Sequence, residues 1–233
     1  MRQLLLPSLP EEGSFLADPD GSHHLLHVLR LERGALLTVS DGRGLEGEAR
    51  LTSVERNLAR LELVQLRRLP PPLPRLVLLG VPKPALLEEA LTLGTEAGAT
   101  TFRLLRCRYS QVLPLRQDRL EKILRTAATQ CRRSWLPTIE GPLDLSAAVA
   151  DLPPTRFLAE AGAPALASCA QAAALAIGPE GGFHPEEISF LQEAGFVPAG
   201  LGPHILRNPT AVAVGLGRLF TTAGCRGRGA AVP

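Results

Sequence analysis

Three segments in the last third of the chain contain residues that could hold a small ligand. They are residues 158–162, 177–182 and 201–207, and each is a glycine-containing stretch at the end of a short apolar run. Glycine lets a backbone approach a ligand closely, and loops at strand ends expose amide and carbonyl groups that can bind an adenine or a ribose. We expect the three segments to form one pocket if the fold brings them together.

Each segment taken alone is weak evidence for a pocket. The GPEGG sequence at 178–182 could equally be a tight turn before a helix, because HPEE at 184–187 has the proline and acidic residues typical of a first helical turn. The chain also lacks a GxGxxG sequence after a strand and a GxxxxGKS or GxxxxGKT sequence. A Rossmann dinucleotide site and a phosphate-binding P-loop are therefore disfavoured.

The three segments lie in a region that alternates between predicted strands and predicted helices. The strand-like sequences are LVLLGVP, TTFRLL, TRFLAEAG, ALAIGPEGG and VPAGLG, and the helix-like ones are PALLEEALTLGTEAG, DRLEKILRTAATQCRR and HPEEISFLQEAG. This alternation predicts an α/β domain with a mainly parallel sheet. Ligands of such sheets bind at the carboxyl ends of the strands, where the three segments fall.

Positive charge is concentrated in the middle of the chain. Residues 71–139 carry eleven basic and five acidic side chains, whereas residues 1–70 carry nine and ten, and residues 140–233 carry five and eight. DRLEKILRTAATQCRR predicts an amphipathic helix over residues 118–133 with basic residues on one side. That side is either a solvated helix face or a phosphate-binding surface. The upstream arginines 103, 106 and 108 favour RNA.

The first 70 residues alternate short apolar runs with turn sequences and predict a small β-barrel or sheet. Asp41-Gly42 is typical of a hairpin in which ALLTVS pairs with LEGEARL. A helix is expected over residues 22–31, with Ser22 as its N-cap. His23 and His27 have the spacing of metal ligands, but no acidic or cysteine partner lies at a recognisable offset, so we expect no metal site.

The proline-rich sequence LPPPLPRL at 69–76 is the expected linker, because consecutive prolines favour an extended backbone. It divides the chain into domains 1–70 and 71–233. The N-terminus has too short an apolar run for a signal peptide and no stretch is long enough to span a bilayer, so we expect a cytoplasmic protein. The four cysteines are far apart and are expected to be reduced thiols.

The order of motifs along the chain resembles the RsmE family, the bacterial small-subunit rRNA uridine-N3 methyltransferases of the SPOUT superfamily. The motifs are HHLLHVLRL, VSDGRG, TEAG, ATQCRR, IGPEGGF with PEEI, and LGPHILR with TA, and they cover nearly the whole chain. The resemblance implies a PUA-like RNA-binding β-barrel over 1–70 and a SPOUT methyltransferase domain over 71–233 with a C-terminal deep trefoil knot. It also implies S-adenosyl-L-methionine as cofactor, small-subunit rRNA or the assembled small subunit as partner, and a homodimer.

The resemblance also implies roles for residues that match the family's motifs. The resemblance places Arg207 at the mouth of the cofactor pocket. From the chemistry of N3 methylation we expect Arg207 to stabilise negative charge on the target base. Glu180 would act as a base or an orienting group, or would only tie down its own loop. The cofactor-binding residues would be Leu158, Glu160, Gly178, Gly182, Leu201, Gly202, Ile205, Leu206 and Thr210. Arg108 and Arg133 match the family's arginines and would face RNA. The basic helix face adds Arg125 and Arg132 as RNA-binding candidates, and the predicted N-terminal helix adds His23 and Arg30.

One position departs from the family pattern, which usually has a glutamate before Thr-Ala. Here Asn208-Pro209 precedes Thr210-Ala211. Asparagine is a good N-cap and proline a good first helical residue, so the pair can start the final helix without the glutamate. Any chemical role of that glutamate cannot be transferred. Two alternatives stay open: an enzyme of the same superfamily that modifies another RNA nucleoside, and a non-catalytic rRNA-binding assembly protein with a vestigial pocket.

Overall fold

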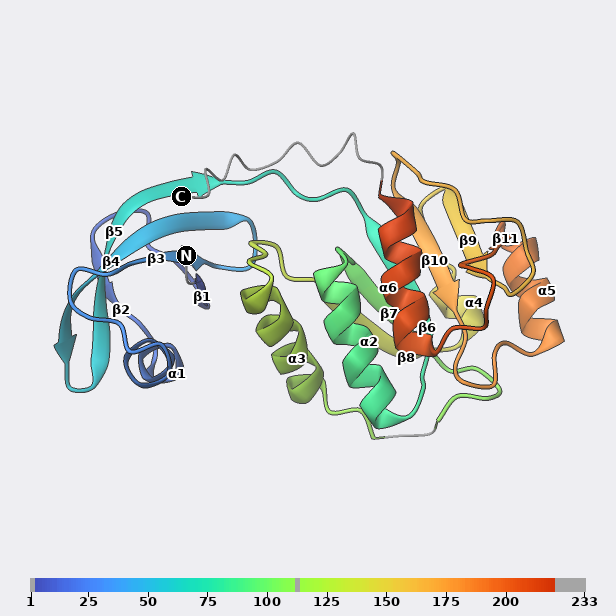
Figure 1. Ribbon diagram of the computed structural model, residues 1–233, viewed down its shortest axis with the longest axis horizontal. Coiled ribbons are helices and arrows are strands. Elements are labelled where there is room, and N and C mark those ends of the chain that lie inside the picture. The colour runs from blue at the N-terminus through green and yellow to red at the C-terminus, as the bar shows by residue number, and fades with distance from the viewer. Residues whose placement is uncertain (1–2, 112–113, 221–233) are drawn as a thin grey trace. The chain divides into compact units, whose positions relative to one another are not determined.

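The computed structural model describes residues 3–111 and 114–220, which divide into two compact units. The first unit comprises the described chain up to Pro72 together with Arg125–Leu136, and the second comprises Leu73–Leu124 and the chain from Pro137 onward. Figure 1 shows the helices and strands of both units, and each unit has its own hydrophobic core. Residues 69–74 form neither helix nor strand, so the extended segment is two residues shorter than predicted.

The first unit is built on one five-stranded sheet in the order β1-β3-β4-β5-β2. β1 and β3 are parallel, and the other neighbours are antiparallel. β3 pairs with β4 across residues 41–44, which confirms the predicted hairpin. The core of this unit includes Leu25, Leu37, Leu51 and Leu61, all fully buried. The strands are β1 (Gln3–Leu5), β2 (Ser14–Leu16), β3 (Leu36–Ser40), β4 (Leu45–Glu55) and β5 (Leu58–Arg68).

The predicted helix of the first unit is present, but its start was wrong. α1 (Pro19–His23) begins three residues earlier and runs directly into a π-helical turn, η1 (His24–Val28). Its N-cap is Asp18, whose carboxylate accepts from the Gly21 amide at 2.6 Å. Ser22 lies inside the helix, where its buried hydroxyl donates to the Ala17 carbonyl and accepts from the Ala59 amide. Ser22 therefore fastens the helix to β5 instead of capping it.

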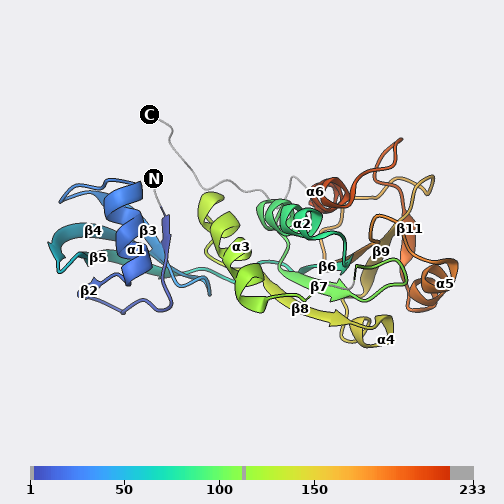
Figure 2. The same cartoon turned by 90° about the horizontal axis from the view of Figure 1, so that it is seen from below.

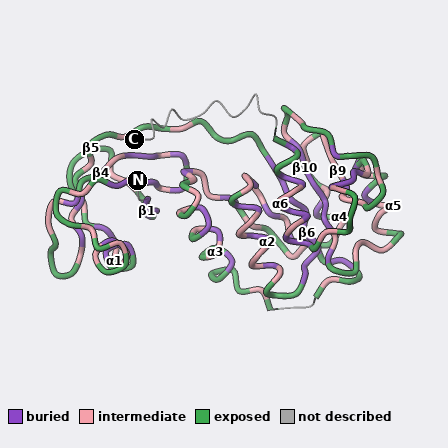
Figure 3. The backbone as a smooth tube through the Cα atoms, in the orientation of Figure 1, coloured by how far each residue is buried: buried purple, intermediate pink, exposed green. Residues whose placement is uncertain are grey.

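The second unit is built on a six-stranded sheet in the order β11-β9-β10-β6-β7-β8, and every neighbouring pair is parallel. This confirms the predicted α/β class and the parallel sheet. The strand β8 was not predicted. Figure 3 shows β6 and β10 at the buried centre of the sheet, in keeping with their continuous apolar sequences. The strands are β6 (Arg75–Gly80), β7 (Thr101–Leu105), β8 (Thr138–Leu143), β9 (Thr155–Ala159), β10 (Ala173–Ile177) and β11 (Val197–Ala199).

Helices cover both faces of this sheet, as Figure 2 shows for α2 and α6 on one side and α4 on the other. The alternation of side chains along β6 explains the two layers: Val77 and Leu79 pack on the face of α2 and α6, and Leu76 and Leu78 pack on the opposite face. The helices are α2 (Pro84–Glu96), α3 (Gln117–Gln130), α4 (Leu145–Ala148), α5 (Pro185–Glu193) and α6 (Asn208–Leu219).

The basic helix α3 ends at Gln130, three residues before the predicted end. Arg132 has a left-handed backbone with φ of 58°, and it lies in the segment Arg125–Leu136 that belongs to the first unit. There the Leu136 amide donates to the Gly42 carbonyl and the Gly44 amide donates to the Ser134 carbonyl, each at 2.8 Å. Tertiary hydrogen bonds to the β3–β4 hairpin thus end the helix that its sequence alone would extend.

Gly44 is required for this contact in two ways. Its φ is +91°, and a Cβ atom there would lie within 2.8 Å of three ring atoms of Trp135. Any side chain at this position would therefore be strained and would displace the indole.

Among the residues that the structure describes, no helix is long and apolar enough to cross a bilayer.

Candidate cofactor pocket and RNA-binding residues

The order β11-β9-β10 brings three predicted loops to one edge of the sheet. Because the three strands are neighbours and parallel, the segments that follow them meet at their carboxyl ends. A cavity of about 600 Å³ lies there, and residues from all three loops line it. Its volume lies within the range of sites for small molecules and cofactors. Leu86 of α2 and Ala211 of α6 complete its wall.

The GPEGG loop closes on itself and leaves open space at its last glycine. The Gly182 amide donates to the Pro179 carbonyl at 2.9 Å, and a Cβ at Gly178 would lie 2.9 Å from the Gly182 carbonyl carbon. Gly182 has a φ of +74°, with nothing within 4 Å of a Cβ placed there. The glycines thus permit a tight loop whose backbone faces the cavity without covering side chains.

Glu180 links this loop to the start of α2. Its carboxylate Oε1 accepts from the Lys83 amide at 3.0 Å, and Lys83 is the N-cap residue of α2. A carboxylate at a helix N-terminus satisfies an amide that lacks a partner within the helix and interacts favourably with the helix dipole. Glu180 therefore ties together two segments beside the cavity, rather than only its own loop.

Asn208 corrects a second capping prediction. The N-cap of α6 is Arg207, with no side-chain capping bond, and Asn208 is the first helical residue. Asn208 as a whole residue is 5% exposed, and its side-chain Nδ2 donates to the Gly178 carbonyl at 2.7 Å. Its Oδ1 is buried without a partner among the described residues. Asn208 thus joins the GPEGG loop to the end of the 201–207 loop instead of capping its own helix.

Arg207 lies on the wall of the cavity at the start of α6. Its side chain is 67% exposed, and its guanidinium is 3.5 Å from the Glu89 carboxylate of α2. An exposed ion pair of this length contributes little stability, so the arginine can exchange it for another anion at small cost.

Nine of the predicted catalytic and cofactor residues line this cavity. They are Glu160, Gly178, Glu180, Gly182, Leu201, Gly202, Ile205, Leu206 and Arg207. Two others are not part of its described lining. Leu158 lies in β9 with its side chain in the core layer of Leu191 and Phe196, because strand alternation turns it to the other face. Thr210 is half-buried in the first turn of α6.

Several lining residues were missed by sequence reasoning. His204 lies within the predicted 201–207 segment and could have been included on that ground. Asn208 was noticed only as a helix cap. Ala211 belongs to the TA motif and could have been included on that ground. Leu86 has no such signal, because it reaches the cavity only through the packing of α2 against the sheet.

Of the predicted RNA-binding arginines, Arg108 lies in the second unit, in the loop after β7. It is exposed, its amide donates to Glu187 at 2.7 Å, and its Nη1 lies 3.1 Å from His184 Nε2. Both partners belong to the start of α5, where a capping box of His184 and Glu187 confirms the predicted first turn. Arg108 is thus held beside the GPEGG loop.

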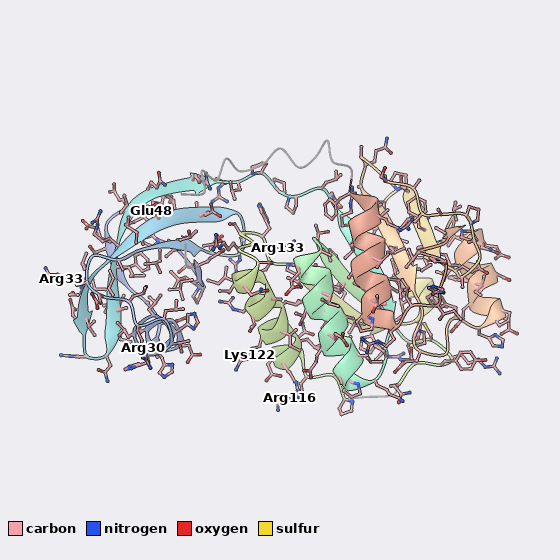
Figure 4. The ribbon with its side chains drawn as sticks, in the orientation of Figure 1. Arg30, Arg33, Glu48, Arg116, Lys122 and Arg133 are labelled. Carbon is pink, nitrogen blue, oxygen red and sulfur yellow. The ribbon has the colours of Figure 1, made fainter. Side chains whose placement is uncertain are left out.

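The other predicted arginines, near the C-terminal end of α3, differ in how far their side chains are exposed to solvent. Arg125 donates to the Leu5 carbonyl at 3.3 Å, whereas Arg132 is exposed. Burial lowers the pKa of the Arg133 guanidinium, because desolvation disfavours its charged form. Figure 4 shows Arg133 beyond the C-terminal end of α3, with Lys122 and Arg116 toward the other end. Arg132 and Arg133 were predicted within the helix, and the structure corrects this.

His23 and Arg30 lie on the exposed surface of the first unit, at the end of α1 and after η1. The rings of His23 and His27 are 5.1 Å apart. Within residues 3–111 and 114–220, no group of three His, Cys, Asp or Glu side chains is placed to hold a metal ion.

Burial raises the pKa of the Cys107 thiol to about 12, so this thiol is not a nucleophile at neutral pH.

Replacing Arg132 by alanine tests the RNA-binding prediction with the least structural disturbance. Because the side chain is exposed, we expect RNA binding to weaken and the slope of log Kd against log salt to decrease by about one, as for one lost phosphate contact. Filter binding of rRNA over a salt series measures both. Arg218→Ala, exposed on the last turn of α6, is the matched control. An unchanged salt slope for Arg132→Ala would exclude a phosphate contact.

The fold and the cavity define an α/β protein with a ligand site at the carboxyl edge of a parallel sheet, attached to a smaller β unit. Comparison with known protein families identifies which class of α/β protein this is. The RNA methyltransferase domain family matches residues 70–219, and the PUA domain of RNA methyltransferases matches residues 16–64.

Relatives that share one name match most of the chain. The chain is 32% identical to the ribosomal RNA small subunit methyltransferase E of Synechocystis sp. over 84% of its length and 69% of the relative's. It is 33% identical to the Mycobacterium bovis protein of that name, over 90% of this chain and 87% of the relative. The crystal structure of the Neisseria gonorrhoeae protein of that name, bound to S-adenosyl methionine, has 25% identity and a TM-score of 0.84, and covers 93% of this chain and 95% of that chain. The chain belongs to the ribosomal RNA small subunit methyltransferase E family.

Proposed function

We propose that this protein transfers a methyl group from S-adenosylmethionine to small-subunit ribosomal RNA, at N3 of one uridine. The observation that carries the proposal is the cavity at the ends of β9, β10 and β11, lined by three loops that lie within the range matched by the RNA methyltransferase domain family. The Synechocystis and Mycobacterium relatives are small-subunit rRNA methyltransferases by name, and the Neisseria protein was crystallised bound to S-adenosyl methionine.

The residues present fit this cofactor. Leu86, Leu201 and Leu206 give an apolar wall for a ring system, and Glu160 supplies a carboxylate that can accept from hydroxyl groups. The open space at Gly182 and Gly202, where a Cβ would meet nothing within 4 Å, leaves room for a ligand against the backbone. When bound there, S-adenosylmethionine supplies an activated methyl group on a sulfonium.

Methylation of uridine N3 requires loss of the imide proton and a fixed geometry of the reacting nitrogen. Negative charge then spreads onto the base carbonyl oxygens, and Arg207 on the cavity wall is the residue we assign to stabilise it. N3 lies on the Watson–Crick edge, so the base must be unpaired or extruded when it reacts. Positioning of the two reactants should supply much of the rate enhancement.

Glu180 is assigned an orienting role because its carboxylate already holds the Lys83 amide. Glu180→Ala removes this bond, and we expect the Kd for S-adenosylmethionine to rise about tenfold. Glu180→Gln keeps an acceptor oxygen and should lose clearly less affinity and turnover than the alanine variant. Calorimetry and single-turnover methylation measure the two effects. If both variants lose turnover equally while binding the cofactor normally, Glu180 is the general base instead.

Two finer features belong to the same proposal. We assign a deep trefoil knot to the C-terminal segment, supported by the Gly200 amide bonded to the Pro164 carbonyl and the Leu166 amide bonded to the Gly200 carbonyl, which hold that segment against the loop after β9. We also assign a homodimeric state, on the family resemblance. Light scattering coupled to size-exclusion chromatography should give a mass of twice that of the chain, and a monomeric mass would contradict it.

The function is tested by methyl transfer to rRNA from a strain that lacks the modification. We expect labelled methyl groups to enter small-subunit rRNA and mass spectrometry to locate them as 3-methyluridine. Another methylated nucleoside would show that the enzyme has a different target. Absence of both methyl transfer and S-adenosylmethionine binding in calorimetry would favour a non-catalytic RNA-binding protein.

A further inference from the structure

Tyr109 is an exposed aromatic side chain beside the loop that lines the cavity. It is the chain's only tyrosine and is 46% exposed. Among the described tryptophan, tyrosine and phenylalanine residues, only Tyr109 and Phe220 are exposed. Phe220 lies 5.4 Å from the Arg75 guanidinium and against Gly98, so its ring is already used in packing.

The position of Tyr109 relative to the cavity is fixed by Gly181. A Cβ at Gly181 would lie 3.0 Å from Tyr109 Cβ and 3.1 Å from its Cγ, so the tyrosine side chain rests directly on the loop. Gly181 itself lines the cavity. The phenol ring therefore stands next to the cavity wall, outside its lining.

Three contacts hold this segment in place before any RNA arrives. The Arg108 amide is bonded to Glu187, the Arg108 guanidinium lies 3.1 Å from His184, and the Tyr109 ring meets the His184 ring edge-on at 6.2 Å between centroids. The ion pairs of the described residues do not include Arg108, so the charge of its guanidinium stays available for a phosphate. A ring held by its neighbours loses little conformational freedom on binding.

We propose that Tyr109 is a stacking surface for an unpaired base of the RNA strand that enters the cavity, with Arg108 contacting the adjoining phosphate. The proposal rests on the proposed RNA methylation and adds a substrate-binding residue to it. A base removed from its helix loses its stacking neighbours, and aromatic side chains replace them in proteins that bind single-stranded RNA. An exposed ring at the cavity edge, beside a cation, has the chemistry for this.

The test compares three variants in methylation of unmodified small-subunit rRNA. Tyr109→Ala and Tyr109→Leu remove the aromatic ring, and we expect the KM for RNA to rise about tenfold or more, as for loss of one stacked base. Tyr109→Phe keeps the ring and should restore the low KM. The Kd for S-adenosylmethionine and the oligomeric mass should match those of the wild type in all three variants.

Four results would overturn the inference. The first is a native KM for Tyr109→Ala, and the second is an equal rise in KM for Tyr109→Phe and Tyr109→Ala, which would assign the effect to the hydroxyl. The third is loss of cofactor binding, which would make Tyr109 a support of the glycine loop. The fourth is a changed oligomeric mass, which would make the surface around Tyr109 an interface between copies. Failure of the wild-type protein to methylate any RNA would instead contradict the proposed function.

Discussion

Arg207→Ala should reduce turnover in methyl transfer about 100-fold or more, because it removes the donor that we propose to stabilise charge developing only during the reaction. Arg207 lies on the cavity wall at the start of α6, and its present partner, Glu89, is 3.5 Å away in an exposed pair. The arginine can therefore leave Glu89 for the base oxygens at little cost. Single-turnover methylation at saturating cofactor and RNA measures the loss.

Controls separate this role from binding and stability. Arg218→Ala removes an exposed arginine from the other end of the same helix and should leave turnover unchanged. Arg207→Lys keeps the charge but loses the planar fork, so an intermediate turnover is expected. Near-native turnover of Arg207→Ala would refute the assignment, and an equally large loss of cofactor affinity would make Arg207 a cofactor-binding residue.

Asn208→Asp should weaken S-adenosylmethionine binding by more than tenfold. The aspartate has the same shape but no donor, and it places a buried carboxylate oxygen against the Gly178 carbonyl instead of the 2.7 Å hydrogen bond. Asn208→Ala removes the bond without adding charge, and we expect its free energy of unfolding to fall by about 1–3 kcal/mol. Calorimetry and urea denaturation measure the two quantities.

The chain offers one matched control for this change, since its only other asparagine is Asn57. Asn57 is exposed in the turn between β4 and β5 with φ of 65°, a conformation that aspartate also tolerates. Asn57→Asp should leave both cofactor binding and stability unchanged. If Asn208→Asp and Asn208→Ala both bind the cofactor with native affinity, the link between the two loops has no role in the pocket.

Local sequence patterns predicted the elements best where short-range interactions decide them. The Asp41-Gly42 hairpin is present because Asp41 accepts from the Arg43 and Leu45 amides within the same turn. The start of α5 was predicted because proline and the Glu187 cap act within four residues. The alternation of strand-like and helix-like sequences predicted the parallel sheet. The continuous apolar sequences of β6 and β10 fit it, since both faces of such strands are covered.

Predictions failed where a local candidate had a stronger distant partner. Ser22 is a good N-cap in isolation, but its hydroxyl bonds the Ala59 amide of β5, and Asp18 caps the helix instead. Asn208 likewise bonds Gly178 and not its own helix. The helical pattern of α3 continues past Gln130 in the sequence, yet Ser134 and Leu136 bond the β3–β4 hairpin and end it. No periodicity in one segment reports such partners.

The sequence by itself determined which residues could build the cofactor loops and that they follow strands. Only the tertiary structure decided that the loops meet, because their convergence depends on the order β11-β9-β10, and strand order is set by packing of the whole sheet. It also decided that Leu158 faces the core, that Leu86 and Asn208 join the cavity wall, and that Arg125–Leu136 belongs to the first unit. Side-chain direction and long-range hydrogen bonds arise only once distant segments are packed. The sequence motifs therefore predicted the three loops, and only the folded structure showed the cavity that they line.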